Sequence, residues 1–350
     1  MPVTGPTTPD VVDVVALGES MVTFLPSTPG RLADVSSFER GIGGAESNLA
    51  CVLAAAGHSA RWVSRVGADP FGDHLVRAIG GYGVDTAAVQ RDPGRPTGIY
   101  FRTAGDRATD AHEVAYYRAG SAASAMSLAN VDQAAVRAAR ILHLSGITAA
   151  LSPTCRDLLH TLMAPAADRP LISFDVNHRP RLWSRTGDGP ALLLTLARTA
   201  DLVFLGQDEA EAAWGATGGP DRIRELLPEP RVLVVKDGGT GATAYVHPDP
   251  EPVFVPAPRV EVVAATGAGD AFAAGFLSAT LRGLPVRDRL RHGHLMAAAA
   301  LTVPGDLATP PGRARADRLA ALDDEAWGRL RLGPGWTHAD ERADEEVRTP

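Results

Sequence analysis

Short apolar runs rich in β-branched residues alternate with longer stretches of helical periodicity along most of the chain. Runs of this kind are typical of strands buried in a parallel sheet. They occupy residues 11–17, 61–66, 141–144, 171–176, 202–205 and 232–235. The stretches with helical periodicity are 45–56, 71–79, 153–164, 190–200, 208–227, 270–283 and 286–303. This alternation predicts an α/β fold in which helices flank both faces of a mostly parallel central sheet.

Some segments interrupt this alternation. Residues 99–103 and 113–118 have the pattern of short exposed strands with no helix between them, and residues 21–25 resemble them. They predict a small β-sheet lid that stands off the main body, formed from about residues 19–40 and 95–120. Residues 241–263 are predicted to add hairpin strands.

The same pattern sets the expected domain boundaries. We expect residues 1–10, which are rich in Pro and Thr, to be disordered. Residues 11–325 are predicted to form one domain, which includes the lid. The charged segment 326–350 is predicted to be a loose tail.

Composition narrows the range of partners. The 350 residues carry a net charge of −7 with no Lys/Arg cluster, which argues against nucleic acid or an anionic membrane as the main partner. Cys51 and Cys155 make no disulfide framework, and scattered histidines predict no His/Cys metal site. No basic leader precedes an apolar run, and no apolar run reaches the roughly 20 residues that span a bilayer. We therefore expect no signal peptide, no membrane span and a cytoplasmic location.

The stretch 264–272 carries the strongest chemical signal. A glycine turn, Gly267-Ala268-Gly269, opens directly into an apolar helix whose first turn holds Asp270. The glycines allow backbone N–H groups to approach an anion, and the helix N-terminus adds partial positive charge. A phosphate cradle beside a carboxylate that can accept a proton suits phosphoryl transfer from a nucleotide to a hydroxyl. The alternative interpretation is a tight turn with an N-cap.

Two further motifs suit a sugar ligand. The glycines of segment 41–44 precede a helix and allow a polyol to approach the backbone, and Asn48 offers both a donor and an acceptor to hydroxyls. Alternation along a lid strand places Tyr116 and Arg118 on one face, a combination that suits a carboxylate. The alternatives are a glycine turn with a polar helix residue, and an ordinary surface strand.

Two motifs follow predicted buried strands. Arg179 comes shortly after Asp175 and could pair with a phosphate or carboxylate, or with Asp175 itself. Segment 236–242 could wrap a nucleotide base or ribose, or could be a hairpin turn. Ligands of open α/β sheets bind where strands end, so both motifs lie where a site is expected.

Together these motifs resemble the ribokinase-like (PfkB-type) sugar kinases over about residues 13–325. Segments 43–48 and 267–270 are similar to the two family signatures. Segments 97–102, 116–124 and 174–179 are most similar to the 2-keto-3-deoxygluconate kinase subgroup. The resemblance implies a ribokinase-like fold and the phosphorylation of a terminal sugar-acid hydroxyl by ATP with Mg²⁺.

The resemblance also implies roles for individual residues. Asp270 would be the base, next to the anion turn Gly267-Ala268-Gly269, and Asp306 would lie near the sugar. The sugar acid would be held by Gly44, Ala45, Asn48, Tyr100, Tyr116, Arg118 and Arg179. ATP would lie over the anion turn and over Lys236, Gly238, Gly241 and Ala242. Exposed edges of the lid strands suggest a homo-oligomer.

The chain departs from the family pattern at two places. Ala264-Ala265 stands where the family has Asp-Thr, which leaves a monovalent-cation requirement open. Gly206 replaces a polar residue, which leaves Glu209 to support Mg²⁺ through water. The alternatives are a fructokinase-like or other ketose kinase, or a catalytically weak sugar-binding sensor. A nucleoside kinase is less favoured, because Arg118 and Arg179 would face no negative charge on its acceptor.

Overall fold

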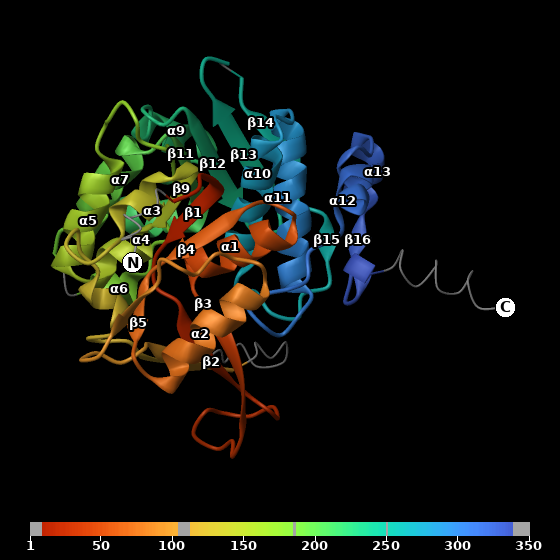
Figure 1. The fold of residues 1–350 in the computed structure, drawn as a ribbon. Helices are drawn as coiled ribbons and strands as arrows, with labels where there is room; N and C mark the ends of the chain where they lie inside the picture. Colours follow the sequence, from red (N-terminus) through yellow and green to blue (C-terminus); the bar gives the residue numbers. More distant parts are fainter. Residues whose placement is uncertain (1–8, 104–112, 185–186, 250, 339–350) are drawn as a thin grey trace.

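A single eight-stranded sheet forms the centre of the computed structural model, which describes residues 9–103, 113–184, 187–249 and 251–338 (Figure 1). The strand order is β14-β13-β12-β11-β10-β9-β1-β4. The strands are β1 (Val12–Leu17), β4 (Ala60–Val63), β9 (Ala139–Ser145), β10 (Leu171–Asp175), β11 (Leu202–Gly206), β12 (Val232–Asp237), β13 (Gly241–Val246) and β14 (Val253–Pro256). Neighbours from β4 to β12 are parallel, and β13 and β14 are added antiparallel. The predicted mostly parallel α/β sheet is confirmed.

Helices cover both faces of this sheet and form two apolar cores. Alternate residues of β1 point to opposite faces, so Val14 packs in one core and Val15 in the other. The first core includes α1 (Ala45–Ala55), α2 (Pro70–Gly81), α10 (Ala268–Leu281) and α11 (Val286–Leu301). The second includes α5 (Pro153–Met163), α7 (Gly189–Thr199), α8 (Gln207–Trp214) and α9 (Pro220–Leu226). Shorter helices are α3 (Gln133–Arg137), α4 (Gly146–Leu151), α6 (Pro180–Trp183) and the 3₁₀ turn η1 (Ala123–Ala125).

The helix predicted over residues 208–227 is instead two helices, α8 and α9. Gly215 adopts the left-handed conformation, with φ of 63°, at the end of α8, and Pro220 is the first residue of α9. A left-handed glycine ends a helix, and proline is favoured at the first position of the next one. Local turn chemistry therefore overrides the helical periodicity here.

The lid is a separate four-stranded sheet with the order β3-β2-β7-β8. Its strands are β2 (Met21–Pro26), β3 (Phe38–Gly43), β7 (Ile99–Arg102) and β8 (Val114–Tyr117). In Figure 1, β2 and β3 extend below the main sheet. Strands β3 and β8 form the two edges, and Tyr117 on β8 is 64% exposed. The predicted homo-oligomer through these edges stays a prediction.

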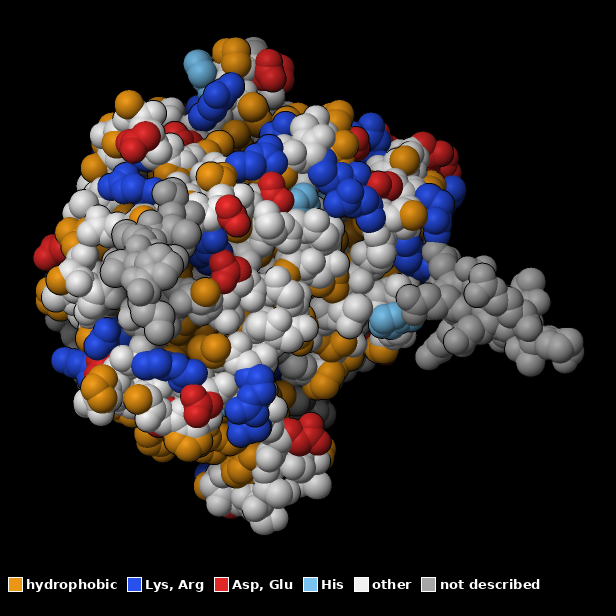
Figure 2. Space-filling model, viewed as in Figure 1, with side chains coloured by type: hydrophobic (Ala, Val, Ile, Leu, Met, Phe, Trp, Pro, Cys, Tyr) orange, Lys and Arg blue, Asp and Glu red, His pale blue; other side chains and the backbone are white. Residues whose placement is uncertain are grey.

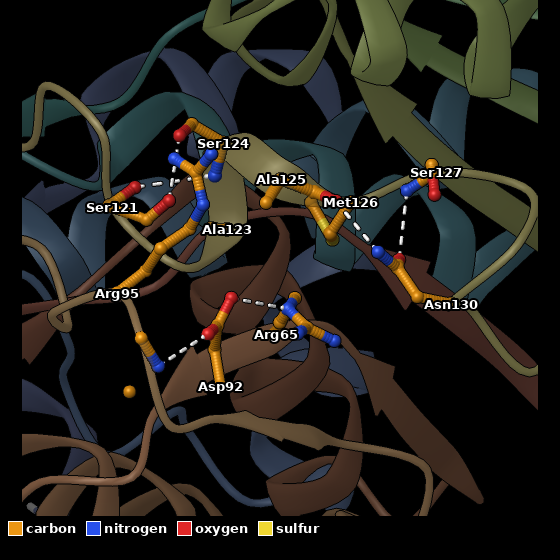
Figure 3. A network of polar contacts seen from close by, with 12 residues as sticks. Arg65, Asp92, Arg95, Ser121, Ala123, Ser124, Ala125, Met126, Ser127 and Asn130 are labelled. Carbon is orange, nitrogen blue, oxygen red and sulfur yellow. Dashed lines mark hydrogen bonds and ion pairs between the residues drawn. The ribbon is translucent and has the colours of Figure 1, made fainter.

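A network of short polar contacts holds the segment that leaves the lid (Figure 3). The Ser124 hydroxyl donates to the Ser121 carbonyl at 2.7 Å, and Asn130 Nδ2 donates to the Ala125 carbonyl at 2.8 Å. Nearby, Arg65 Nε donates at 2.9 Å to Asp92, linking strands β5 (Arg65–Gly67) and β6 (Gln90–Asp92). The Ser124 bond holds Ser121, whose own hydroxyl donates to the buried carboxylate of Glu19.

The face of the molecule in Figure 2 does not indicate a macromolecular partner. Basic and acidic side chains are interspersed over the face in Figure 2, without a continuous basic area on that face. Within the described ranges, none of the helices combines the length and apolar content that crossing a bilayer requires.

The end of the described chain is packed rather than loose. Strand β16 (Arg331–Leu332) pairs in parallel with β15 (Arg259–Val260). Helices α12 (Arg313–Ala320) and α13 (Asp324–Arg329) precede β16, and η2 (Trp336–His338) follows it. Trp327 is 1% exposed, and its Nε1 donates to the Pro256 carbonyl at 2.8 Å. The predicted loose tail is therefore wrong for residues 326–338, because two tryptophans within a charged segment are buried. Residues 339–350 and 1–8 lie outside the described residues.

Trp327→Ala should lower the melting temperature clearly, because deleting a large buried aromatic side chain costs about 3–5 kcal/mol. Thermal unfolding followed by circular dichroism measures the shift. A chain truncated after His338 keeps the described contacts of Trp327 and serves as the control. A Trp327→Ala melting temperature equal to that of the control would mean that the segment adds nothing to stability.

Candidate active site

A cleft of about 790 Å³ lies where the lid meets the carboxyl ends of the central strands. Parallel sheets bind ligands at this edge. The cleft brings together most of the residues singled out from the sequence. They are Gly44, Ala45, Asn48, Tyr100, Tyr116, Arg118, Arg179, Glu209, Lys236, Gly267, Gly269, Asp270 and Asp306.

Four of the predicted residues do not line this cleft: Ala268, Gly238, Gly241 and Ala242. Gly241 and Ala242 lie within β13, and Ala242 is 1% exposed. A Cβ added to Gly241 would lie 2.4 Å from the Val255 carbonyl oxygen. Segment 236–242 is thus the end of one strand and a hairpin, and Gly241 and Ala242 present no surface to a nucleotide. From the sequence alone, a Gly-rich turn after a strand is compatible with both a nucleotide site and a hairpin turn.

The anion turn has the strained geometry that only glycine tolerates. Gly267 has φ of 79° and directly precedes α10. A Cβ added there would lie 2.2 Å from the Asp306 carbonyl oxygen. Both a left-handed φ and this close approach require glycine. The free N–H groups at the start of α10 therefore remain open to the cleft, beside Asp270.

Asp270 lies half-buried in the first turn of α10, and Asn48 Nδ2 donates to its Oδ2 at 2.9 Å. Loss of contact with water, together with the nearby charge of Asp175, raises the pKa of Asp270 from 3.8 to about 7. The Asn48 hydrogen bond and the charges of Arg179 and Lys236 oppose this rise. A carboxylate with a pKa near neutral pH suits a general base.

Two ion pairs lie at the floor of the cleft. Lys236 Nζ is 3.1 Å from Asp175 Oδ2, and Arg179 Nη1 is 3.1 Å from Glu209 Oε1. Arg179 therefore pairs with Glu209 and not with Asp175, the internal partner considered from the sequence. Burial, together with the charge of Asp175, raises the pKa of Glu209.

Arg118 on the lid side is held by a buried carboxylate. Its guanidinium forms an ion pair with Glu19, whose side chain is fully buried, and Ser121 Oγ donates to Glu19 Oε1 at 2.5 Å. The guanidinium carbon lies 5.8 Å from the centre of the Tyr116 ring. Arg118 Nε is buried without a hydrogen-bond partner among the described residues. The arginine is therefore fixed in direction and still has a donor to offer.

Asp306 connects the lid to the anion turn. Its carboxylate accepts from the Tyr100 hydroxyl at 2.5 Å and from Arg102 Nη2 at 2.7 Å, both on β7. Its carbonyl is the atom that approaches Gly267. Burial, with the charge of Asp306, raises the pKa of Tyr100 well above its ordinary value. Asp306 thus lines the cleft itself and also holds two lid residues, Tyr100 and Arg102.

Sequence reasoning assigned no role to four residues of this region. Asp175, Asn177 and Arg102 line the cleft, and Glu19 lies behind Arg118. Asn177 has φ of 40° and a buried, unpartnered Oδ1. A non-glycine residue held in this conformation is a signal of function, but it is visible only in the structure.

Comparison with known proteins identifies the family. The model for the pfkB family carbohydrate kinases matches residues 12–311. This chain belongs to that family. The 2-dehydro-3-deoxygluconokinase of Bacillus subtilis (strain 168) is 34% identical to it over 316 residues, which cover 89% of this chain and 95% of that protein. The predicted kinase family is confirmed.

Two further relatives of this pfkB kinase bear on its ligands. The probable chloroplastic fructokinase-6 of Arabidopsis thaliana is 32% identical over 304 residues, which cover 83% of this chain and 77% of that protein. An uncharacterized sugar kinase from Pyrococcus horikoshii, solved in complex with ATP, matches with a TM-score of 0.75 and 25% identity. That match covers 90% of this chain and 99% of the other.

The cleft of this pfkB kinase has carboxylate oxygens suited to the magnesium ion of a bound nucleotide. Glu209 and Asp175 supply hard carboxylate oxygens near the anion turn. The described residues hold no cluster of three or more His, Cys, Asp or Glu side chains that could cage a metal. Mg²⁺ normally keeps several waters and binds one or two carboxylates plus phosphates. Glu209 therefore fits a magnesium ion held mainly by the nucleotide.

The raised pKa of Asp270 should make the stability of this kinase depend on pH. Between pH 3.8 and about 7 the folded state binds a proton at Asp270 that the unfolded state lacks, so its contribution to stability falls as pH rises. Asp270→Asn removes the charge and still offers Asn48 an acceptor. We expect the variant to gain stability relative to the wild type, by more at pH 8 than at pH 5, in urea unfolding.

Asp157→Asn, at an exposed position on α5, is the matched control and should show no such widening. A stability difference for Asp270→Asn that is the same at both pH values would contradict a pKa raised by burial.

Proposed function

We propose that this kinase transfers the γ-phosphoryl group of ATP to the terminal hydroxyl of 2-keto-3-deoxygluconate, also called 2-dehydro-3-deoxygluconate. One observation carries the proposal: Asp270, at the start of α10, lines the same cleft as Arg118 and Arg179. A sugar acid held by its carboxylate at the arginines would extend a hydroxyl toward Asp270. The name of the relative that is 34% identical supports the same acceptor.

The lid and the start of α1 would hold the sugar. Gly44 and Ala45 line the cleft, and Gly44 packs so closely against the Glu19 carbonyl oxygen that no side chain fits there. Asn48, Tyr100 and Tyr116 would contact hydroxyls, and Arg118 would offer its unpartnered Nε to the carboxylate. Arg179, half exposed, would approach from the opposite wall.

Proton transfer and charge placement would fall to the chain's own residues. When bound, Mg·ATP supplies the phosphoryl group and offsets part of its charge. Asp270 accepts the proton of the acceptor hydroxyl, and the N–H groups of the anion turn face the phosphate charge. Glu209 supports Mg²⁺ through water. Ala264 and Ala265 carry no side-chain oxygen, so a monovalent cation forms no part of the proposal.

A neutral ketose is the second candidate acceptor. The charge of Arg118 is already balanced by Glu19, and one relative is named a fructokinase. The discriminating quantity is the ratio of kcat/KM for the acid to that for fructose, since it reports differential stabilisation in the transition state.

ADP release from ATP should be faster with 2-keto-3-deoxygluconate than with fructose, and comparison with the epimeric 2-keto-3-deoxygalactonate tests the configuration. Asp270→Asn should fold normally and lose turnover by about 10²–10⁴-fold, because it removes the general base. Near-normal turnover by this variant would remove Asp270 from the mechanism. Thermal stabilisation by a sugar without any ADP release would favour a sugar-binding sensor instead.

Arg118→Ala should raise KM for the acid by about 10–100-fold, as expected for a lost hydrogen bond to a charged group, with a smaller effect on fructose. Steady-state kinetics on both substrates measures the difference. Glu19→Gln, which leaves the guanidinium in place and removes its balancing charge, is the companion variant. Equal losses on acid and neutral sugar for Arg118→Ala would count against a carboxylate contact.

A further inference from the structure

The position of Lys236 differs from the one that its sequence context suggests. It lies near the end of β12, and its Nζ is 3.1 Å from Asp175 Oδ2. A Cβ built on Gly269 would lie 3.5 Å from the same Nζ. The ammonium group therefore lies beside the first turn of α10, next to the N–H groups of the anion turn. Gly241 and Ala242, which would complete a base or ribose site around it, are enclosed in the sheet.

Carboxylates surround this ammonium group. Burial alone would lower the pKa of Lys236, but the charges of Asp175, Glu209 and Asp270 outweigh burial and raise it. Lys236 is therefore cationic at neutral pH. Of its three N–H donors, Asp175 takes one in the structure, and the group lines the cleft.

We propose that the Lys236 ammonium group contacts the phosphoryl group in transfer, as a catalytic residue, and that Asp175 is the positioning residue that holds it there. This inference rests on the proposed kinase reaction. In the reaction, the acceptor oxygen forms a bond to the γ-phosphorus while the bond to the bridging oxygen of ADP breaks. The hydroxyl proton passes to Asp270, and the electron pair of the broken bond stays on ADP. Lys236 transfers no proton and offsets the charge on the phosphoryl oxygens.

The ion pair with Asp175 holds the positive charge of Lys236 in a fixed position. Asp175 ends β10, Lys236 lies on β12, and β11 separates the two strands in the sheet. The salt bridge spans the end of β11, and the Asp175 and Lys236 side chains are only 4% and 18% exposed. A preorganised charge in a site with little water stabilises a transition state more than a mobile one does.

Lys236→Met should lower kcat by about 10²–10³-fold, with a much smaller rise in KM for ATP from the lost contact to the γ-phosphoryl group, because it removes one preorganised donor. Asp237→Asn, the neighbouring position on the same strand and outside the cleft lining, is the matched control and should behave as the wild type. Retained kcat with a raised KM for ATP would place the ammonium on the base or ribose and overturn the proposal. If Lys236→Met fails to fold because Asp175 is left unpaired, the double variant with Asp175→Asn should fold and show the same loss of kcat.

The pH profile tests the positioning role separately. Asp270 faces Asn48 from α1, Asp175 from β10, Arg179, and Lys236 from β12. Lys236→Met removes a charge that lowers the Asp270 pKa, so the acidic limb of kcat should move to higher pH. Asp175→Asn removes a charge that raises it, so that limb should move to lower pH. Acidic limbs that stay in place in both variants would mean that the pair has only a structural role.

Nucleotide binding separates failure of this inference from failure of the proposed reaction. Calorimetry with AMP-PNP and with AMP needs no sugar and no turnover. Lys236→Met should weaken AMP-PNP binding by more than it weakens AMP binding, because only AMP-PNP carries a γ-phosphoryl group. Equal losses for the two nucleotides would overturn the role of Lys236. A wild-type enzyme that binds AMP-PNP but phosphorylates none of the sugars would overturn the proposed reaction alone.

Discussion

Holding one half-buried carboxylate at the start of a helix is the constraint around which this cleft is built. Asp270 lies where the N–H groups of α10 favour negative charge, yet its burial favours the protonated form. The Asn48 hydrogen bond and the charge of Lys236 lower the pKa of Asp270, and the charge of Asp175 raises it. The result is a group that both holds and releases a proton near neutral pH. Each neighbour comes from a different element, so the chemistry depends on how α1, β10, β12 and α10 meet.

The lid and the anion turn are mechanically connected through one residue. Asp306 binds Tyr100 and Arg102 of β7 through its carboxylate, while its carbonyl contacts Gly267. A shift of β7 toward a bound sugar would be transmitted to the turn, because buried charged contacts of this kind have few alternative arrangements. Under the proposed function, occupation of the sugar site would therefore be coupled to the geometry of the phosphate site. Such coupling would favour the sugar over water as acceptor.

Most of the fold follows from local patterns. The buried strands are short and apolar on both faces, and the lid strands break the alternation with helices, so periodicity distinguishes the two sheets. The packing of the segment after residue 325 could not be predicted from local patterns, because Trp327 and Trp336 are isolated apolar residues in a charged segment. The burial of Trp327 depends on surfaces of α11 and β14 that are distant in sequence.

In the candidate site, too, residues that are adjacent in the sequence could be predicted, and pairs that are distant in the sequence could not. Motifs in which several residues are adjacent, such as Gly267-Ala268-Gly269-Asp270, could be read directly. Partners chosen in three dimensions could not, and the pairs Lys236–Asp175 and Arg179–Glu209 are of this kind. Sequence spacing says which residues follow strands, but the order of strands decides which charges meet.

The pair Arg118–Glu19 changes how acid recognition can work in this cleft. A lone arginine would attract any anion through its net charge, but here a buried carboxylate cancels most of that field. What remains is the direction of the Nε–H donor, which Glu19 and Ser121 fix from behind. Under the proposed function, discrimination between a sugar acid and a neutral sugar would then depend on the placement of an acceptor oxygen more than on attraction at a distance. A fixed donor rejects a ligand that leaves it unpaired, since a buried N–H without an acceptor is costly.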